Sequence, residues 1–226
     1  MHLKDKIYIF VIIGLFAISC APNHIVHKSY KRSLIDTVYH FPSLSFISVI
    51  EKGNTGIQND SLSLVSKAIL DSLVLNNPAF KAIRLEIDNP VLLNNANSEI
   101  LGIFNAILTS NSITKIDIPQ NMKQIIDQNN QRFFMATLIE GFGRKSGNYG
   151  KQVAKGIGVG ILTLGLYAPV PIKNKIRLMN FIIDKETMKI VYFSSTLPIE
   201  KSPTEIKIIN KQYQKIIPPW PSMNRE

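Results

Sequence analysis

Hydrophobic positions recur along this chain with two periods, and together they predict a sheet covered by helices. Apolar side chains alternate with their neighbours, or run on continuously, over residues 44–50, 82–87 and 133–142, as in half-buried or fully buried strands. Two further apolar runs, 176–183 and 189–195, are separated by a short polar segment that indicates a hairpin. These segments predict five strands, of which the last three are antiparallel.

The helical period appears between these strands. Leu62, Val65, Ile69 and Leu73 are spaced as on one helix face, after a cap at Asn59 or Asp60 and before Asn76-Asn77-Pro78. The same period predicts a helix over 97–108, and Pro119 suits the first turn of a short helix that follows. Ser202-Pro203-Thr204-Glu205 has the form of a capping box and predicts a last helix that runs to Pro218.

The order of these elements indicates one α/β (α+β) domain over residues 41–217, with a mixed sheet, a C-terminal antiparallel hairpin and helices packed on the sheet. The hairpin reads Phe181-Ile-Ile-Asp-Lys-Glu-Thr-Met-Lys-Ile-Val-Tyr192. This order and this hairpin resemble a periplasmic fold family. It is shared by the N-terminal domain of the Tol translocation protein, a penicillin-binding-protein activator lipoprotein and the curli-secretion channel lipoprotein. Met188 stands where that family usually has glycine.

The N-terminus has the layout of an export signal. Lys4 and Lys6 precede an uncharged apolar run over residues 7–18, and Ser19 and Cys20 follow. A charged region, a short apolar region and a small residue before the cut are typical of a secretory signal peptide, which predicts cleavage between Ser19 and Cys20. A run of about a dozen residues is too short for a bilayer span, which takes roughly 20 helical residues.

The tetrad Ala17-Ile18-Ser19-Cys20 resembles the lipobox of bacterial lipoproteins, although the commonest form begins with Leu. The resemblance implies that Cys20 is acylated, with palmitate-type chains, and becomes the mature N-terminus. Two or three acyl chains hold a protein on a membrane almost permanently. The expected location is the periplasmic face of the outer membrane of a Gram-negative envelope. The alternative is a structural cysteine that follows an uncleaved helix.

The remaining terminal segments show little hydrophobic period. Residues 20–40 read as a polar, basic tether between the lipid and the domain, and residues 218–226 as an irregular tail. Cys20 is the only cysteine in the chain, so an intramolecular disulfide is excluded.

The chain is basic, with a formal net charge of +10. Its lysines are scattered and lack the interleaved aromatic residues that stack nucleic-acid bases, so we expect no nucleic-acid partner. The positive net charge favours contact with anionic membranes or with cell-wall polymers.

Residues 153–172 form the most distinctive segment of the mature chain. Glycines and branched residues alternate in it, at Gly156, Ile157, Gly158, Val159, Gly160 and Ile161. A phosphate-binding loop would need a following Lys-Ser/Thr pair, which is absent. Three interpretations remain: a loop buried on the sheet or under a partner, a membrane-contacting segment, or a self-association segment that makes a homo-oligomer.

Residues suited to catalysis are few. His24 and His27 lie in the predicted tether, where a pair of imidazoles does not make a dedicated metal site. His40 borders the first strand, and Glu140 follows a strand as either a cleft acid or a surface residue paired with Arg144 or a lysine. Asp184 suits a turn. We expect no catalytic residue, no metal and no cofactor.

The sequence therefore predicts a non-enzymatic envelope lipoprotein that acts as a binding or adaptor module, with an envelope protein or a cell-wall polymer as partner. One alternative is a subunit of an oligomeric secretion or envelope assembly that uses residues 153–172. The other is an envelope-acting hydrolase that uses Glu140 or His40.

Overall fold

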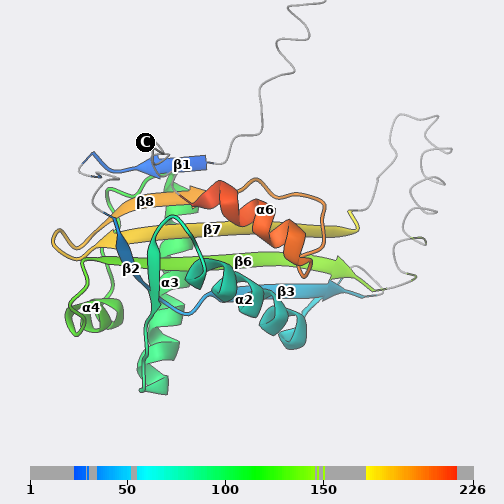
Figure 1. Ribbon diagram of the computed structural model, residues 1–226. Coiled ribbons are helices and arrows are strands. Elements are labelled where there is room, and N and C mark those ends of the chain that lie inside the picture. The colour runs from blue at the N-terminus through cyan, green and yellow to red at the C-terminus, as the bar shows by residue number, and fades with distance from the viewer. Residues whose placement is uncertain are drawn as a thin grey trace, which may run out of the picture.

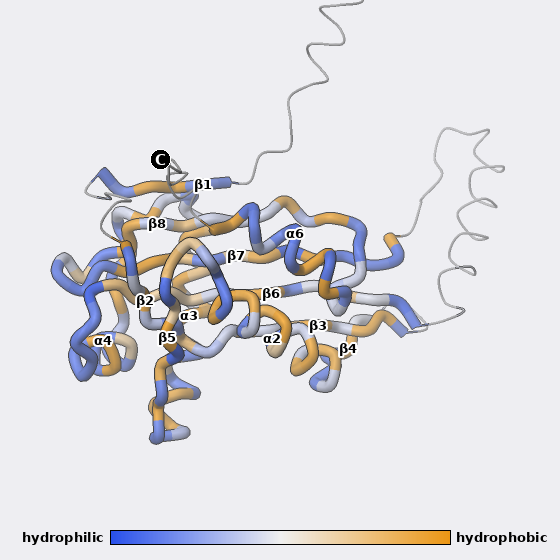
Figure 2. The backbone as a smooth tube through the Cα atoms, in the orientation of Figure 1, coloured by the Kyte–Doolittle hydropathy of each residue, from blue (hydrophilic) through white to orange (hydrophobic). Residues whose placement is uncertain are grey.

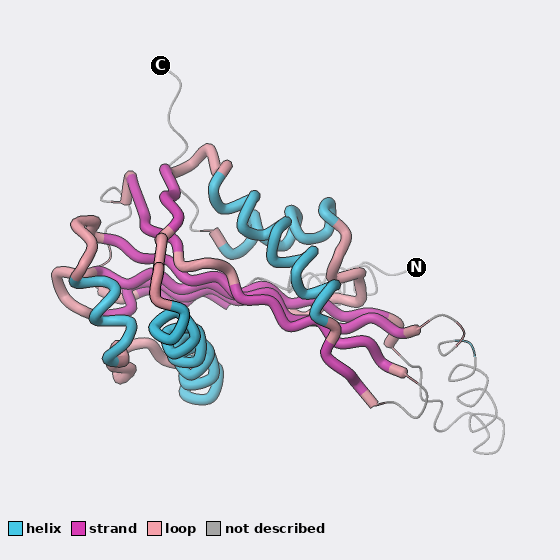
Figure 3. The backbone as a smooth tube through the Cα atoms, turned by 90° about the horizontal axis from the view of Figure 1, so that it is seen from below, coloured by secondary structure: helices cyan, strands magenta, loops and turns pink. Residues whose placement is uncertain are grey.

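A computed structural model describes residues 23–28, 30, 35–51, 55–145, 147, 150 and 172–217. These residues form one mixed sheet with helices packed on both of its faces (Figure 1). Figure 3 shows the sheet between the two helical layers. The predicted fold class is confirmed.

Eight strands are present in the described ranges. They are β1 (Asn23–Val26), β2 (Thr37–His40), β3 (Leu44–Ile50), β4 (Gly56–Gln58), β5 (Lys81–Arg84), β6 (Phe133–Arg144), β7 (Asn174–Asp184) and β8 (Lys189–Ser195). Their order is β1-β8-β7-β6-β2-β5, and β3 pairs with the remaining length of β6 and with β4. The β6-β7-β8 ladder is antiparallel, as predicted, whereas β2 and β3 lie parallel to β6.

The helices on this sheet are α2 (Asp60–Leu75), α3 (Pro90–Ser110), α4 (Gln120–Asp127) and α6 (Ile206–Ile216). Asn59 caps α2 as predicted, because its side chain accepts a hydrogen bond from the Leu62 N–H at 2.9 Å. Helix α3 begins at Pro90, seven residues before the predicted start, because Asn89 caps it and proline suits its first position. The predicted capping box of α6 does not form: Glu205 is the N-cap and makes no side-chain cap bond.

The alternation along β6 divides the core into two layers. Phe134, Ala136 and Leu138 face α3 and α4, whereas Phe133, Met135 and Ile139 face α2 and α6. Each layer is apolar and buried, so β6 is covered on both faces over most of its length. This double burial explains why its sequence is a continuous apolar run.

The hairpin between β7 and β8 is fixed by Asp184, which acts as the predicted turn former. Its carboxylate accepts a hydrogen bond from the Glu186 N–H at 3.1 Å and two from the Arg132 guanidinium at 3.0 and 2.9 Å. Met188 takes a left-handed conformation with φ of 49°. Glycine adopts that conformation without steric cost, which is why the hairpins that this one resembles use it.

The predicted tether over residues 20–40 is wrong at Asn23–Val26 and Thr37–His40, because β1 and β2 both belong to the sheet. Strand β1 pairs with β8 from Asn23↔Ser195 to Val26↔Tyr192, and β2 pairs with β5 and β6. Strand β1 is a mostly exposed edge strand, so its sequence carries no apolar alternation. In β2, a polar side chain, His40, occupies a core position and hides the pattern.

Candidate functional site

Several residues singled out from the sequence lie outside the described residues. They are Ser19 and Cys20 of the predicted cleavage and lipidation site, and Gly156, Ile157, Gly158, Val159, Gly160 and Ile161 of the apolar segment. Their assignments remain predictions. In the part of the chain that is described, no helix combines the length and the hydropathy that a bilayer span requires.

His40 belongs to a buried polar network that joins β2, β3, β6 and α2. Its Nε2 lies 3.0 Å from Thr137 Oγ1, and Thr137 Oγ1 lies 2.7 Å from Ser43 Oγ. The Ser43 N–H in turn donates to Asp71 of α2 at 2.9 Å. His40, Ser43 and Thr137 are at most 1% exposed, so the three side chains are closed off from solvent.

Burial lowers the pKa of His40 to about 4, because the interior disfavours the charged imidazolium. The Asp71 carboxylate opposes this shift, and the positive charges of Arg84 and Lys67 reinforce it. The imidazole is therefore neutral at pH 7. Its role here is structural, since a neutral ring can share a hydrogen with Thr137 without bringing a charge into the core.

Glu140 lies away from this network. It follows Leu138 on the face of β6 opposite to Thr137, so strand alternation separates it from His40. Its carboxylate forms an ion pair with Arg177 of β7 at 2.7 Å, and neither Arg144 nor a lysine is that partner. Thus the structure does not bring together Glu140 and His40, either of which the hydrolase alternative would use.

His24 is fixed by its place in β1. Its Nδ1 lies 2.9 Å from the Tyr192 hydroxyl, and partial burial lowers the pKa of the imidazole. Across the residues that the structure describes, no three His, Cys, Asp or Glu side chains are grouped so as to hold a metal ion.

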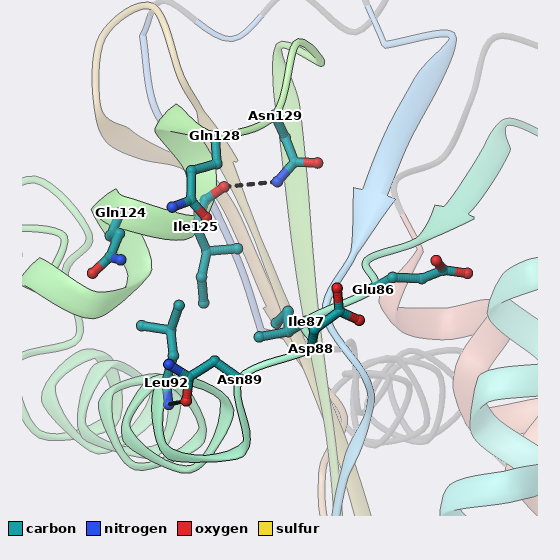
Figure 4. Close-up of a pocket in the computed structure, with 9 residues that line it drawn as sticks. All are labelled: Glu86, Ile87, Asp88, Asn89, Leu92, Gln124, Ile125, Gln128 and Asn129. Carbon is teal, nitrogen blue, oxygen red and sulfur yellow. Dashed lines mark hydrogen bonds between the residues drawn. The ribbon is translucent and has the colours of Figure 1, made fainter.

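An open polar cleft lies between the start of α3 and the end of α4 (Figure 4). Its volume is about 270 Å³, just below the range of about 300–1,000 Å³ that is typical of small-molecule sites. The segment that joins β5 to α3 supplies one wall of the cleft. Leu85 and Ile87 of this segment pack against the core, and the alternate residues Glu86 and Asp88 are exposed. Gln124, Ile125 and Gln128 of α4 supply the other wall.

The cleft is rich in hydrogen-bonding groups over an apolar base. Asn89 is already engaged, because it caps α3 through the Val91 and Leu92 N–H groups at 2.9 and 3.1 Å. Asn129 donates to the Ile125 carbonyl at 2.8 Å. Asp88, Gln124 and Gln128 line the cleft, whereas the Glu86 carboxylate is directed away from the other lining residues (Figure 4). Ile87, Leu92 and Ile125 supply the apolar surface of the cleft. Such a lining suits a ligand that has hydroxyl or amine donors and an apolar face.

Sequence reasoning missed this cleft. The signal was a pair of acidic residues at alternate positions, Glu86 and Asp88, just before the Asn89-Pro90 helix start. The amides of the second wall come from α4, which lies more than 30 positions further along the chain. Only the fold brings the two walls together.

The outward face of α2 from Ser61 to Leu75 is a second surface feature, because its exposed residues carry no charge after Asp60, the exposed first residue of the helix. These uncharged exposed residues are Ser61, Leu64, Val65, Ala68, Ser72 and Leu75. Leu64 and Val65 are 65% and 47% exposed, and Figure 2 shows the apolar character of this helix. A helix that is apolar on its outer as well as its inner face is typical of an element covered by a partner.

Comparison with known proteins yields only distant structural likeness. The chain matches no protein-family model and no curated protein. It is similar to a PelC dodecamer from Paraburkholderia phytofirmans at 9% identity and a TM-score of 0.40, over 86% of this chain and 92% of that chain. A single-substitution variant of that dodecamer matches at 10% identity and a TM-score of 0.35, over 87% and 96% of the two chains. Neither likeness decides the function.

We predict that acid destabilises this fold through His40. Its pKa is lowered from 6.5 to about 4 on folding, so protonation favours the unfolded chain. The contribution of neutral His40 to the free energy of unfolding is fully present above pH 6.5. It is lost as the pH falls from 6.5 to 4, and the total loss is up to about 3 kcal/mol. The measurement is urea unfolding at a series of pH values across that range.

The test variant is His40→Gln, which retains a donor for Thr137 but does not titrate. We expect this variant to be less stable than the wild type at pH 7 and to show a flatter dependence of its unfolding free energy on pH. If His40→Gln lost stability as steeply as the wild type in acid, the buried imidazole would not be the cause.

Proposed function

We propose that this protein is a non-enzymatic lipoprotein of the bacterial envelope that binds an envelope polymer at the cleft between α3 and α4. In this proposal Cys20 carries the lipid, and the domain lies on the periplasmic face of the outer membrane. The observation that carries the binding role is the cleft itself, with an exposed carboxylate and amides above an apolar base.

The cleft favours a saccharide over the other partners considered. Sugar hydroxyls and amines can donate hydrogen bonds to Asp88, and the amides of Gln124 and Gln128 can donate or accept. The C–H face of a sugar ring can pack on Ile125 and Leu92. The chain as a whole is basic, so long-range attraction to an anionic polymer would raise the local concentration of ligand. The cleft then supplies the selective contacts.

Burial of His40, Ser43 and Thr137 supports the non-enzymatic part of the proposal. A general base must come within hydrogen-bond reach of its substrate, and these side chains are closed off in the described structure. The buried cluster of His40, Ser43 and Thr137 therefore does not support the hydrolase alternative.

The lipid attachment is tested with native protein beside a Cys20→Ala variant. We expect an intact mass that corresponds to cleavage before Cys20 plus acyl chains, and membrane association that is lost in the variant, because one covalent site carries all of the lipid. Native protein that keeps residues 1–19 and carries no lipid would show instead that the apolar run 7–18 is the anchor.

The cleft is tested by cosedimentation of the detergent-purified protein with purified peptidoglycan sacculi. We expect Glu86→Gln together with Asp88→Asn to weaken binding about tenfold or more, because a hydrogen bond to a charged group such as the Asp88 carboxylate contributes roughly 1.5–3 kcal/mol. Glu200→Gln together with Glu205→Gln is the control, since it removes two exposed carboxylates elsewhere.

Both double variants make the protein more basic by the same amount, so non-specific attraction to an anionic polymer rises equally in the two. Weaker binding in the cleft variant alone would therefore report loss of specific contacts. Equal binding by the two variants would contradict a role for the cleft.

A second candidate function is that of a subunit in an assembly of identical copies, and the α2 outer face favours it. Two copies of a chain with a net charge of +10 repel one another, and this repulsion is smallest where they meet through an uncharged surface. The face of Leu64 and Val65 is such a surface, and anchoring in one membrane would raise the effective concentration of the copies.

This candidate predicts a change in mass when charge is placed on α2. We expect Leu64→Lys together with Val65→Lys to convert an oligomer in detergent to monomer, whereas Val91→Lys, at an exposed valine of α3, should leave the mass unchanged. Lysine is a good helix former, so the substitutions leave α2 intact. Light scattering of the detergent-purified protein measures the mass. A monomeric wild type, or an unchanged mass in the double variant, would contradict self-association through this face.

A further inference from the structure

The N-terminal strand fixes where the chain leaves the domain. Strand β1 is held by four pairs to β8 and by a hydrogen bond from the His27 N–H to the Val191 carbonyl at 2.9 Å. Its first residue, Asn23, also donates from its side chain to Asn111, the C-cap of α3, at 3.3 Å. The exit point thus lies beside both the end of β8 and the end of α3 (Figure 1).

Only Ala21 and Pro22 stand between Asn23 and Cys20. A fully extended chain covers at most about 3.3–3.6 Å per residue, so Cys20 lies within about 11 Å of Asn23. The polar layer on each side of a bilayer core is roughly 5–8 Å thick. A lipid on Cys20 would therefore hold Asn23 at or just above the level of the headgroups. This step rests on the lipidation proposed above.

The surface around Asn23 suits such a position. Leu197 follows the end of β8 and is 44% exposed, and Leu108 lies one turn before Asn111 and is 36% exposed. The flanking segments 105–116 and 193–199 contain no acidic residue. Apolar side chains can enter the interface there, and no carboxylate repels anionic headgroups.

Helix α3 links this surface to the cleft. Its C-terminal end contacts Asn23, whereas Asn89 and Leu92 at its N-terminal end line the cleft. At 1.5 Å per residue, its 21 residues span about 30 Å. The membrane-side surface and the cleft are thus at opposite ends of one rigid helix.

From these contacts we infer that the protein docks on the lipid surface through the end that contains Asn23, Leu108 and Leu197, with the cleft directed away from the membrane. The occupant of this surface is the headgroup region of the bilayer that carries the lipid anchor. Helix α3 is then a spacer that presents the cleft to polymer in the periplasm, about 30 Å from the anchored end.

The test uses lipidated full-length protein in vesicles of phosphatidylethanolamine and phosphatidylglycerol that contain a nitroxide-labelled lipid as fluorescence quencher. Leu197→Cys and Gln124→Cys each add one thiol at an exposed position, and a fluorophore is attached to it. In a bacterial lipoprotein the cysteine sulfur carries the lipid, so Cys20 does not react. We expect loss of emission for the label at Leu197 and unchanged emission for the label at Gln124.

The control inserts a Gly/Ser linker of about 20 residues between Pro22 and Asn23. Such a linker has a root-mean-square length of about 25 Å and should restore the emission at Leu197 while the protein still floats with vesicles. Floated protein in which both labels are quenched equally, or in which Leu197 is not quenched, overturns the orientation and leaves lipidation intact. Protein that does not float at all overturns the lipidation and this inference together.

Discussion

Strand β6 is the constraint on which the rest of the structure depends. Most of its length is paired on both sides, by β7 along one edge and along the other by β2 at Phe133–Met135 and then by β3 at Leu138–Arg144. Two successive strands can share one edge only if the chain between them stays close to β6. The polar network achieves this, because Thr137 of β6 holds both His40 at the end of β2 and Ser43 at the start of β3.

The same network couples the sheet to α2, since Asp71 accepts the Ser43 N–H. Removing one member would leave buried polar groups without partners, which costs about 1–3 kcal/mol for each neutral group. His40 was therefore a catalytic candidate in the sequence, whereas in the fold it joins β2 to β6 through Thr137. That difference is set by solvent access, which spacing along the chain does not reveal.

Prediction from the sequence succeeded for strands whose side chains are buried on one face or on both. It failed for a strand whose place in the sheet is set by main-chain hydrogen bonds. The apolar runs of β6, β7 and β8 and the Asn59 cap were readable because their side chains report their surroundings. Strand β1 was not, because an exposed edge strand is held by main-chain hydrogen bonds that any side chains permit. The cleft was unpredictable for another reason: its walls come from Glu86–Asn89 and from α4, and their proximity is a property of the tertiary fold.

The correction at the N-terminus changes how the domain can work on a membrane. A tether of about 20 residues would let the domain turn freely, so that every surface could face lipid or polymer. With β1 in the sheet, the chain enters the fold within three residues of Cys20, and a lipid there leaves the domain little freedom to rotate away from its exit point. If Cys20 is lipidated as proposed, the edge strand that carries the weakest sequence signal has the largest effect on orientation. Its four pairs with β8, together with the hydrogen bond from the His27 N–H to the Val191 carbonyl, then make the first connection between the lipid and the core.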